Sequence, residues 1–129
     1  MNKKKILNEL RKKYPKANIV LNDQQNPTEI ICEIEPTSKH SDYDIAIAVI
    51  DKSIPHYHKK TTEEYEVIKG KLVLTVGNKK IILKKGDKFV IKPNTIHFGK
   101  GQETWVKTTS KPGWTQEDHL LIPPQRWTL

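Results

Sequence analysis

Apolar residues recur every three to four positions at the start of the chain, which is the spacing of one face of an α-helix. Ile6, Leu7 and Leu10 lie on this face, and the lysines of residues 3–5 and 12–13 lie elsewhere. Asn2 can cap the first turn with its side-chain oxygen, and Pro15 ends the pattern because proline disrupts helix interiors. The sequence therefore predicts a short amphipathic α-helix within residues 1–14 that docks on a larger body.

The rest of the chain changes to short runs rich in Ile and Val that are separated by turn-forming residues. Residues 45–50 are apolar on both faces, which predicts a strand buried on both sides. Gly77 and Asn78 join two alternating runs and predict a tight hairpin, whereas the glycines within 99–101 predict a turn. The predicted strands are 17–22, 29–35, 44–51, 64–69, 71–76, 79–83, 88–92 and 103–109. Short strands at this spacing predict an all-β fold, a sandwich or small barrel over residues 17–110.

The final segment, residues 111–129, is rich in proline and tryptophan and is too apolar to remain in solvent. We expect it to pack against the barrel or against a partner chain. The three tryptophans, Trp105, Trp114 and Trp127, could stack on a sugar ring, although core packing or a dimer contact is the more common use of this side chain.

Length and composition narrow the class of protein. A chain of 129 residues supports one compact domain, and its single cysteine, Cys32, excludes an internal disulfide and a cysteine-based zinc site. No apolar run approaches the ~20 residues that cross a bilayer. No apolar segment follows the basic start of the chain, so we expect a cytoplasmic protein without a secretory signal.

The net charge of +8 raises the question of nucleic-acid binding. Of the 23 basic residues 21 are lysines, whereas recognition of phosphates and guanine edges favours arginine. The lysines are also spread from Lys3 to Lys111 instead of clustering on one element. We therefore expect a lysine-rich solvated surface and a small-molecule ligand, with neither nucleic acid nor a membrane as partner.

The segment from Pro55 to Glu63 carries the residues best suited to chemistry. On a strand, His56 and His58 point to the same side, and the five residues that follow allow Glu63 to return as an oxygen ligand. Two histidines and one carboxylate with open positions are typical of a non-haem metal site. His97 ends another predicted strand and can add a third imidazole. A metal held in this way can polarise a carbonyl, acidify a bound water or bind dioxygen.

These residues also resemble the two motifs of the cupin family. The first motif, G-x5-H-x-H-x(3–4)-E-x6-G, is matched by four residues in order: His56, His58, Glu63 and Gly70. The second, G-x5-P-x-G-x2-H-x3-N, is matched by Gly86 and His97. Asn94 stands where the second motif has its inner glycine, and asparagine tolerates the left-handed backbone that a glycine would supply. The gap of six residues before Gly70 favours Glu63 over its neighbour Glu64 as the acidic ligand.

The resemblance implies a single cupin domain, a double-stranded β-helix or jelly-roll barrel, here with a short N-terminal α-helix. It implies that His56, His58, Glu63 and His97 bind one divalent transition metal, with Fe, Mn, Zn, Ni and Co all open. Cupins include dioxygenases, decarboxylases, sugar isomerases and epimerases as well as non-catalytic binding modules. Many members are dimers, so the resemblance also implies a homodimer.

Several other side chains are candidates for moving protons. Tyr65 has the same strand parity as Glu63 and faces the interior, where it could be a proton donor, a substrate contact or only a core aromatic. Glu33, Lys107 and His119 could do acid–base work if they reach the pocket, although a solvated position is more common for such residues. Of these, Tyr65 and Glu33 are our candidate catalytic residues.

Three functions follow from these residues and from the resemblance. The first is a metal-dependent enzyme of the isomerase or epimerase kind that acts on a small oxygenated metabolite such as a sugar or hydroxy-carbonyl compound. The second is an Fe(II)-dependent dioxygenase that uses the same ligands. The third is a non-catalytic module that binds a small molecule through its metal. An isomerase turns over its substrate without oxygen, a dioxygenase consumes oxygen, and a binding module turns over nothing under either condition.

Overall fold

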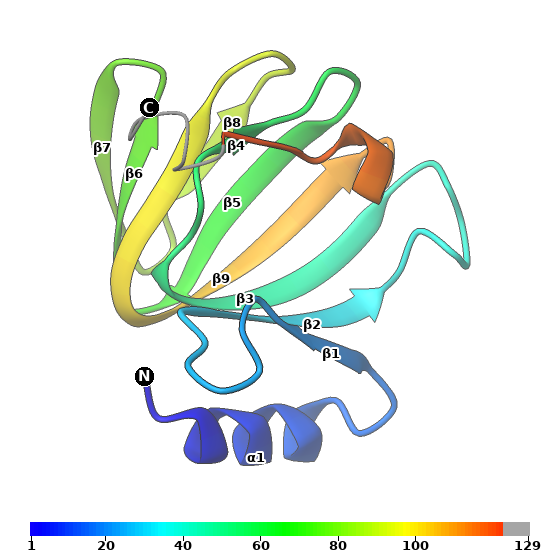
Figure 1. Ribbon diagram of the computed structural model, residues 1–129, viewed down its shortest axis with the longest axis vertical. Helices are drawn as coiled ribbons and strands as arrows, with labels where there is room; N and C mark the ends of the chain where they lie inside the picture. The colour runs from blue at the N-terminus through cyan, green and yellow to red at the C-terminus, as the bar shows by residue number, and fades with distance from the viewer. Residues whose placement is uncertain (123–129) are drawn as a thin grey trace.

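The computed structural model describes residues 1–122 of the 129-residue chain. Within this range the chain forms one α-helix, a curled sheet of ten strands and one short 3-10 helix (Figure 1). The elements are α1 (Lys3–Lys13), β1 (Asn18–Leu21), β2 (Glu29–Glu35), β3 (Asp44–Lys52), β4 (His56–Tyr57), β5 (Thr62–Lys69), β6 (Lys71–Val76), β7 (Lys79–Lys84), β8 (Lys88–Ile91), β9 (His97–Lys111), η1 (Gln116–Asp118) and β10 (Leu120–Leu121). The predicted all-β barrel with an N-terminal helix is thus confirmed.

Helix α1 lies against the outside of the sheet (Figure 1). The Asn2 side chain accepts a hydrogen bond from the main-chain N–H of Lys5 at 3.1 Å, so the predicted cap is present. Ile6 and Leu10 are the buried residues of the helix, 2% and 0% exposed. They pack with side chains from one face of β2 and β3 in an aliphatic cluster that also contains Trp105.

Strand β3 is the wall between this outer cluster and the barrel interior. Ile47 and Val49 belong to the cluster under the helix, whereas Ala48 and Ile50 belong to the interior cluster. The prediction that this strand is buried on both sides is therefore confirmed. Strand pairing runs in the order β1-β2-β3-β9-β4-β10, and β9 also pairs with β5 and β6.

The predicted turn at residues 99–101 is wrong, because β9 runs through it as one strand of 15 residues. Gly99 pairs with β6, whereas Thr104 pairs with β3, so the strand changes partner within this stretch. A Cβ at Gly101 would lie 2.3 Å from the Thr104 hydroxyl oxygen, and one at Gly99 would lie 3.0 Å from a methyl of Leu72. The glycines allow close packing at a partner change, and they do not end the strand.

Two other turn predictions hold. Gly77 has a φ of +60° between β6 and β7, where Val76 pairs with Lys79 in a tight hairpin. Asn94 has a φ of +65°, the left-handed backbone expected at the position where the motif has glycine.

After β9 the chain returns across the open end of the barrel. η1 follows, and β10 pairs with β4, where Leu121 lies opposite His56. The tail therefore packs on the barrel as far as Ile122. The rest of the predicted tail, including Trp127, lies outside the described residues. In the part of the chain that the structure covers, no helix is long and apolar enough to cross a bilayer.

Candidate metal centre

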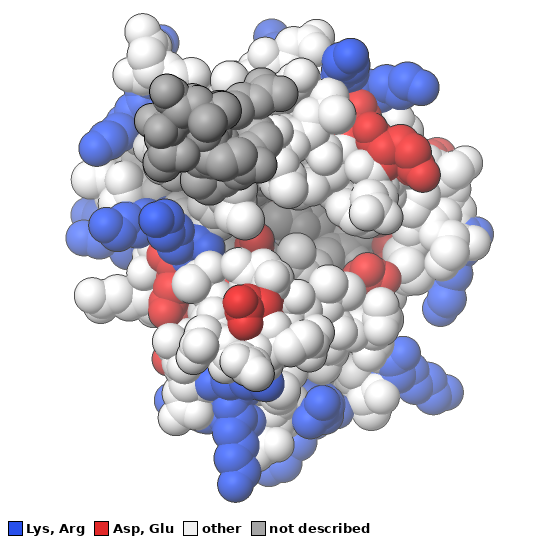
Figure 2. Space-filling view, viewed as in Figure 1, with Lys and Arg blue, Asp and Glu red and all other residues white. Residues whose placement is uncertain are grey.

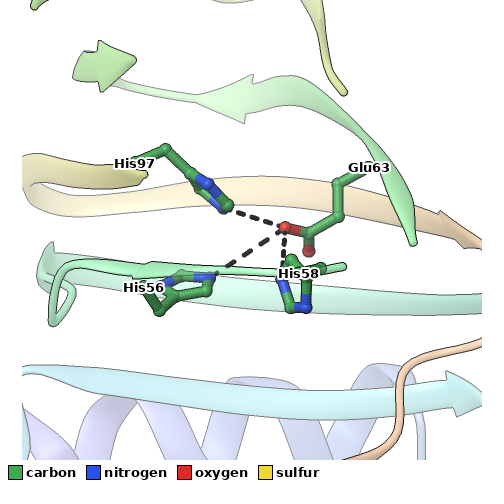
Figure 3. Close-up of side chains that lie close together, drawn as sticks. All are labelled: His56, His58, Glu63 and His97. Atoms are coloured by element: carbon green, nitrogen blue, oxygen red, sulfur yellow. Dashed lines mark hydrogen bonds and ion pairs between the residues drawn. The ribbon is translucent and has the colours of Figure 1, made fainter. Parts of the chain in front are cut away.

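Four buried side chains from separate segments converge inside the barrel (Figure 3). His56 begins β4 and lies directly opposite His97, which begins β9, while His58 follows β4 and Glu63 lies in β5. Their exposed fractions are between 0% and 7%. One potential ligand atom from each residue lies within 4.8 Å of all the others. The structure thus brings together the four residues that the motif spacing selects, and Glu64 stays on the opposite face of β5.

Each of the three imidazoles is oriented by a hydrogen bond from its Nδ1 atom to a main-chain carbonyl. The acceptors are Ile54 for His56 at 2.8 Å, Asp118 for His58 at 2.7 Å, and Thr95 for His97 at 2.9 Å. A carbonyl can only accept, so Nδ1 carries the proton, and in a neutral ring Nε2 keeps its lone pair. All three Nε2 atoms therefore point to the common centre as potential donors to a metal.

The Glu63 carboxylate faces these lone pairs. Its Oε1 lies 2.9 Å from Nε2 of His58, 2.9 Å from Nε2 of His97 and 4.0 Å from Nε2 of His56. Nε2 of His58 is buried and has no hydrogen-bond partner of suitable geometry. Acceptors that face one another in a buried site need a positive charge between them. Three imidazoles and one carboxylate fit a divalent transition metal, so this cluster could hold one.

The electrostatics of the metal-free site follow from burial and from these contacts. Burial, together with the neighbouring His97, lowers the pKa of His56 to about 3. Burial also opposes the charged form of His58, but the Glu63 carboxylate close to its Nε2 outweighs it and raises the His58 pKa. Burial alone would raise the pKa of Glu63, yet the imidazoles of His58 and His97 beside its Oε1 hold it well below the usual range. His56 is therefore a neutral imidazole at physiological pH, as a metal ligand must be.

The returning tail supports this cluster through Asp118. The main-chain carbonyl of Asp118 accepts the Nδ1 hydrogen bond of His58, as described above. Its carboxylate accepts main-chain N–H bonds from Lys59, Lys60 and Thr61 at 2.9 to 3.1 Å. Burial alone would raise the Asp118 pKa, but these bonds lower it. Sequence reasoning missed Asp118, because 60 residues separate it from His58 and no local motif links them.

A cavity of about 610 Å³ adjoins the cluster, and His56 and Glu63 form part of its lining. Its other walls are the inner faces of β2, β3, β5 and β9 and the returning tail. Figure 2 shows the hollow on this side of the molecule, with lysine and arginine side chains gathered toward the periphery. A pocket of this size accommodates a small metabolite beside the histidine cluster.

Both candidate catalytic residues line this cavity. Tyr65 is 5% exposed, and its ring stands edge-on to His97 with centroids 6.1 Å apart. Burial, together with the charges of Glu63 and Glu29, raises the Tyr65 pKa well above its usual value. Glu33 lies in the same cross-strand row as Tyr65, because Glu33 pairs with Ala46, Ala46 with Thr108, and Thr108 with Tyr65.

His119 also lines the cavity, so both His119 and Glu33 reach the pocket. The His119 ring lies 4.4 Å from the ring of His56, and its Nδ1 accepts a hydrogen bond from Trp114 Nε1 at 3.1 Å. Burial lowers the His119 pKa. Lys107 lies on the strand face opposite that of the interior residue Val106 and does not line the cavity.

The tryptophans have different positions. Trp114 lines the cavity and is 38% exposed, so it is available to a ligand. Trp105 is buried under the helix and belongs to the core. Trp127 lies outside the described residues.

Comparison with known proteins agrees with this geometry. Residues 45–102 match the family model described as a cupin domain, a stretch that contains all four clustered residues. No curated protein matches the sequence of the chain.

Several solved structures share the fold at low sequence identity. A Streptomyces PAC13 variant with uridine is 12% identical with a TM-score of 0.73, and the match covers 85% of this chain and 88% of that chain. Another structure describes Pac13 as a nucleoside dehydratase. KdgF from Halomonas sp. is 20% identical with a TM-score of 0.62 over 74% of this chain and 89% of that chain. A cupin-2 domain from Rhodospirillum rubrum is 9% identical with a TM-score of 0.70, and the match covers 89% of this chain and 81% of that chain.

Proposed function

Starting from the premise that this chain holds a small cupin-type domain, we propose that it is a metal-dependent enzyme of the isomerase or epimerase kind. The substrate is a small oxygenated molecule such as a sugar or hydroxy-carbonyl compound. His56, His58, Glu63 and His97 hold the metal. The observation that carries the proposal is the set of three Nε2 lone pairs aimed at one carboxylate beside a cavity.

A divalent ion at this position would polarise substrate oxygens and acidify a hydrogen on the adjacent carbon. The chain's own residues then move the proton. The Tyr65 hydroxyl stays protonated because its pKa is raised, so it donates to a substrate oxygen. Glu33 stands in the same row, with strands β3 and β9 between it and Tyr65, and accepts the proton from carbon.

His119 supports the oxygen side of the substrate. Because Nδ1 accepts the Trp114 N–H, the proton of a neutral His119 ring resides on Nε2. That N–H can donate a hydrogen bond to a ligand in the cavity. Buried, oriented donors of this kind stabilise negative charge that develops on oxygen during reaction.

The first test is the metal content of the purified protein by elemental analysis. We expect about one transition-metal ion per chain in the wild type and at least a tenfold loss in His58→Ala, with an unchanged circular dichroism spectrum. His40→Ala is the matched control, because among residues 1–122 His40 bonds within its own loop and to Glu35, away from the cluster. Unchanged metal content in His58→Ala would refute the ligand assignment.

The second test is chemical. The metal-loaded protein is incubated without oxygen in D₂O with a panel of aldoses, ketoses and nucleosides, and deuterium incorporation at carbon is followed by NMR. Exchange that depends on metal and on Glu33 supports the proposal. Oxygen consumption in place of exchange would identify a dioxygenase, and neither activity with any metal would identify a binding module.

A further inference from the structure

The cavity is acidic although the molecule as a whole is basic. The net charge of the chain is +8, yet among the described residues the lining includes no lysine or arginine. Five carboxylates line it instead: Glu29, Glu33, Glu35, Asp44 and Glu63. Two carboxylates, Glu63 and one other, would balance the 2+ charge of a bound metal, and the remaining three would stay unbalanced. The pocket is therefore negative on balance whether or not the metal is bound.

Most of these carboxylates have partners within the protein. Glu63 contacts the histidines, and Asp44 accepts the main-chain N–H of Trp114 at 2.5 Å. Glu35 lies 3.5 Å from a ring nitrogen of His40. Glu33 has the proton-transfer role proposed above. Glu29 differs, because within residues 1–122 its carboxylate makes no hydrogen bond or ion pair, although it lines the cavity.

Glu29 is also not a solvated surface residue. It lies at the opposite end of β2 from Glu35, on the inward face shared with Ile31 and Glu33. Burial, together with the charge of Glu63, raises its pKa to about 7. A carboxylate that is partly desolvated and has no partner gains more from a bound cation than a solvated one does.

We propose that the cavity takes a polyhydroxylated small molecule that bears an ammonium group, which pairs with Glu29, and that it rejects phosphorylated and carboxylated analogues. The hydroxyl groups lie toward the histidine cluster and His119, and the exposed ring of Trp114 offers a stacking face. This inference rests on the proposed function and narrows its substrate class by charge. The lysines of the outer surface do not enter the site, so the basic composition does not predict an anionic substrate.

The test compares three sugars that differ only at carbon 6: 6-amino-6-deoxyglucose, glucose and glucuronate. Binding to the Co²⁺-loaded protein is measured by titration calorimetry at low ionic strength. We expect the amino sugar to bind at least tenfold more tightly than glucuronate, with glucose between them. In Glu29→Gln, the preference for the amino sugar should fall at least threefold.

Glu64→Gln is the matched control, because it removes the same charge from the outer face of β5 and should keep the full preference. Glucuronate binding as tightly as the amino sugar, a preference unchanged in Glu29→Gln, or no binding of any of the three sugars would overturn the inference. The absorption spectrum of bound Co²⁺ is recorded separately. Its absence would refute the metal centre, whereas a normal cobalt spectrum without charge preference would refute the cationic ligand and leave the metal centre standing.

Discussion

The two faces of β2 and β3 carry opposite chemistry, although they belong to the same strands. The outer face presents Ile30, Cys32, Ile47 and Val49 to helix α1 and forms a dry cluster. The inner face presents carboxylates to a cavity that ends at the histidines. Because side chains alternate along a strand, one segment can supply a core to one side and a site to the other. The outer face should therefore set stability, and the inner face should set binding.

The largest expected effect comes from the outer face. Leu10 is 0% exposed in the cluster under the helix, so Leu10→Ala should lower the free energy of unfolding by about 3 kcal/mol. Urea denaturation of the metal-free protein measures this loss, and Lys12→Ala on the exposed side of the helix is the control. Metal content should not change. A loss of metal in Leu10→Ala equal to that in His58→Ala would show that the two faces are not separate.

The inner face should make the stability of the metal-free protein depend on pH. In the unfolded chain His56 takes up a proton as pH falls below 6.5, whereas in the folded protein it stays neutral until about pH 3. At His56 the unfolded state therefore binds more protons in this window, so His56 lowers the free energy of unfolding as pH falls, by up to about 1.4 kcal/mol per pH unit. Glu29, whose pKa is raised to about 7, acts in the opposite sense over the same window, so the His56 contribution is the difference between wild type and a His56 variant. His58 has a raised pKa and acts in the opposite sense above pH 6.5, where its contribution is lost as pH rises.

Urea titrations of chelator-treated protein between pH 7 and pH 4 measure this dependence. His56→Gln should reduce the slope, because glutamine does not titrate. Leu10→Ala should keep the wild-type slope at a lower stability. A His56→Gln protein with the wild-type slope would assign the effect to other groups.

A smaller effect is expected where the tail meets the metal centre. In Asp118→Ala the main-chain carbonyl that orients His58 remains, but the carboxylate that fixes it against residues 59–61 is lost. Metal affinity should fall about tenfold, as is usual when a group behind a ligand is removed. Competition with a chromophoric chelator measures the affinity, and Glu117→Ala, an exposed neighbour, is the control. Equal affinities in the two variants would show that Asp118 has no part in positioning His58.

Much of this arrangement is predictable from local sequence. Strand parity places Cys32 with Ile30 on one face of β2 and Glu33 on the other, as the structure has them. The offsets between His56, His58 and Glu63 predict their convergence because a strand and a short turn leave the chain little choice.

The parts that sequence reasoning missed depend on contacts between distant segments. Asp118 reaches the site only because the tail crosses the barrel, and nothing near it in the sequence indicates this. His119, a candidate from the sequence, is brought to the site by the same crossing. The continuity of β9 through Gly99 and Gly101 follows from how closely Leu72 and Thr104 pack against them. Glycine predicts a turn from local propensity, but here its value is the space it leaves for its neighbours.

The binding role of the inner face depends most on a metal held at the histidine cluster. X-ray absorption spectroscopy of the metal-loaded protein tests this directly, because it reports the atoms bound to the ion. The account predicts a shell of three imidazole nitrogens and a carboxylate oxygen at about 2.0–2.2 Å for zinc. A shell of water oxygens without the scattering pattern of imidazole rings would contradict it.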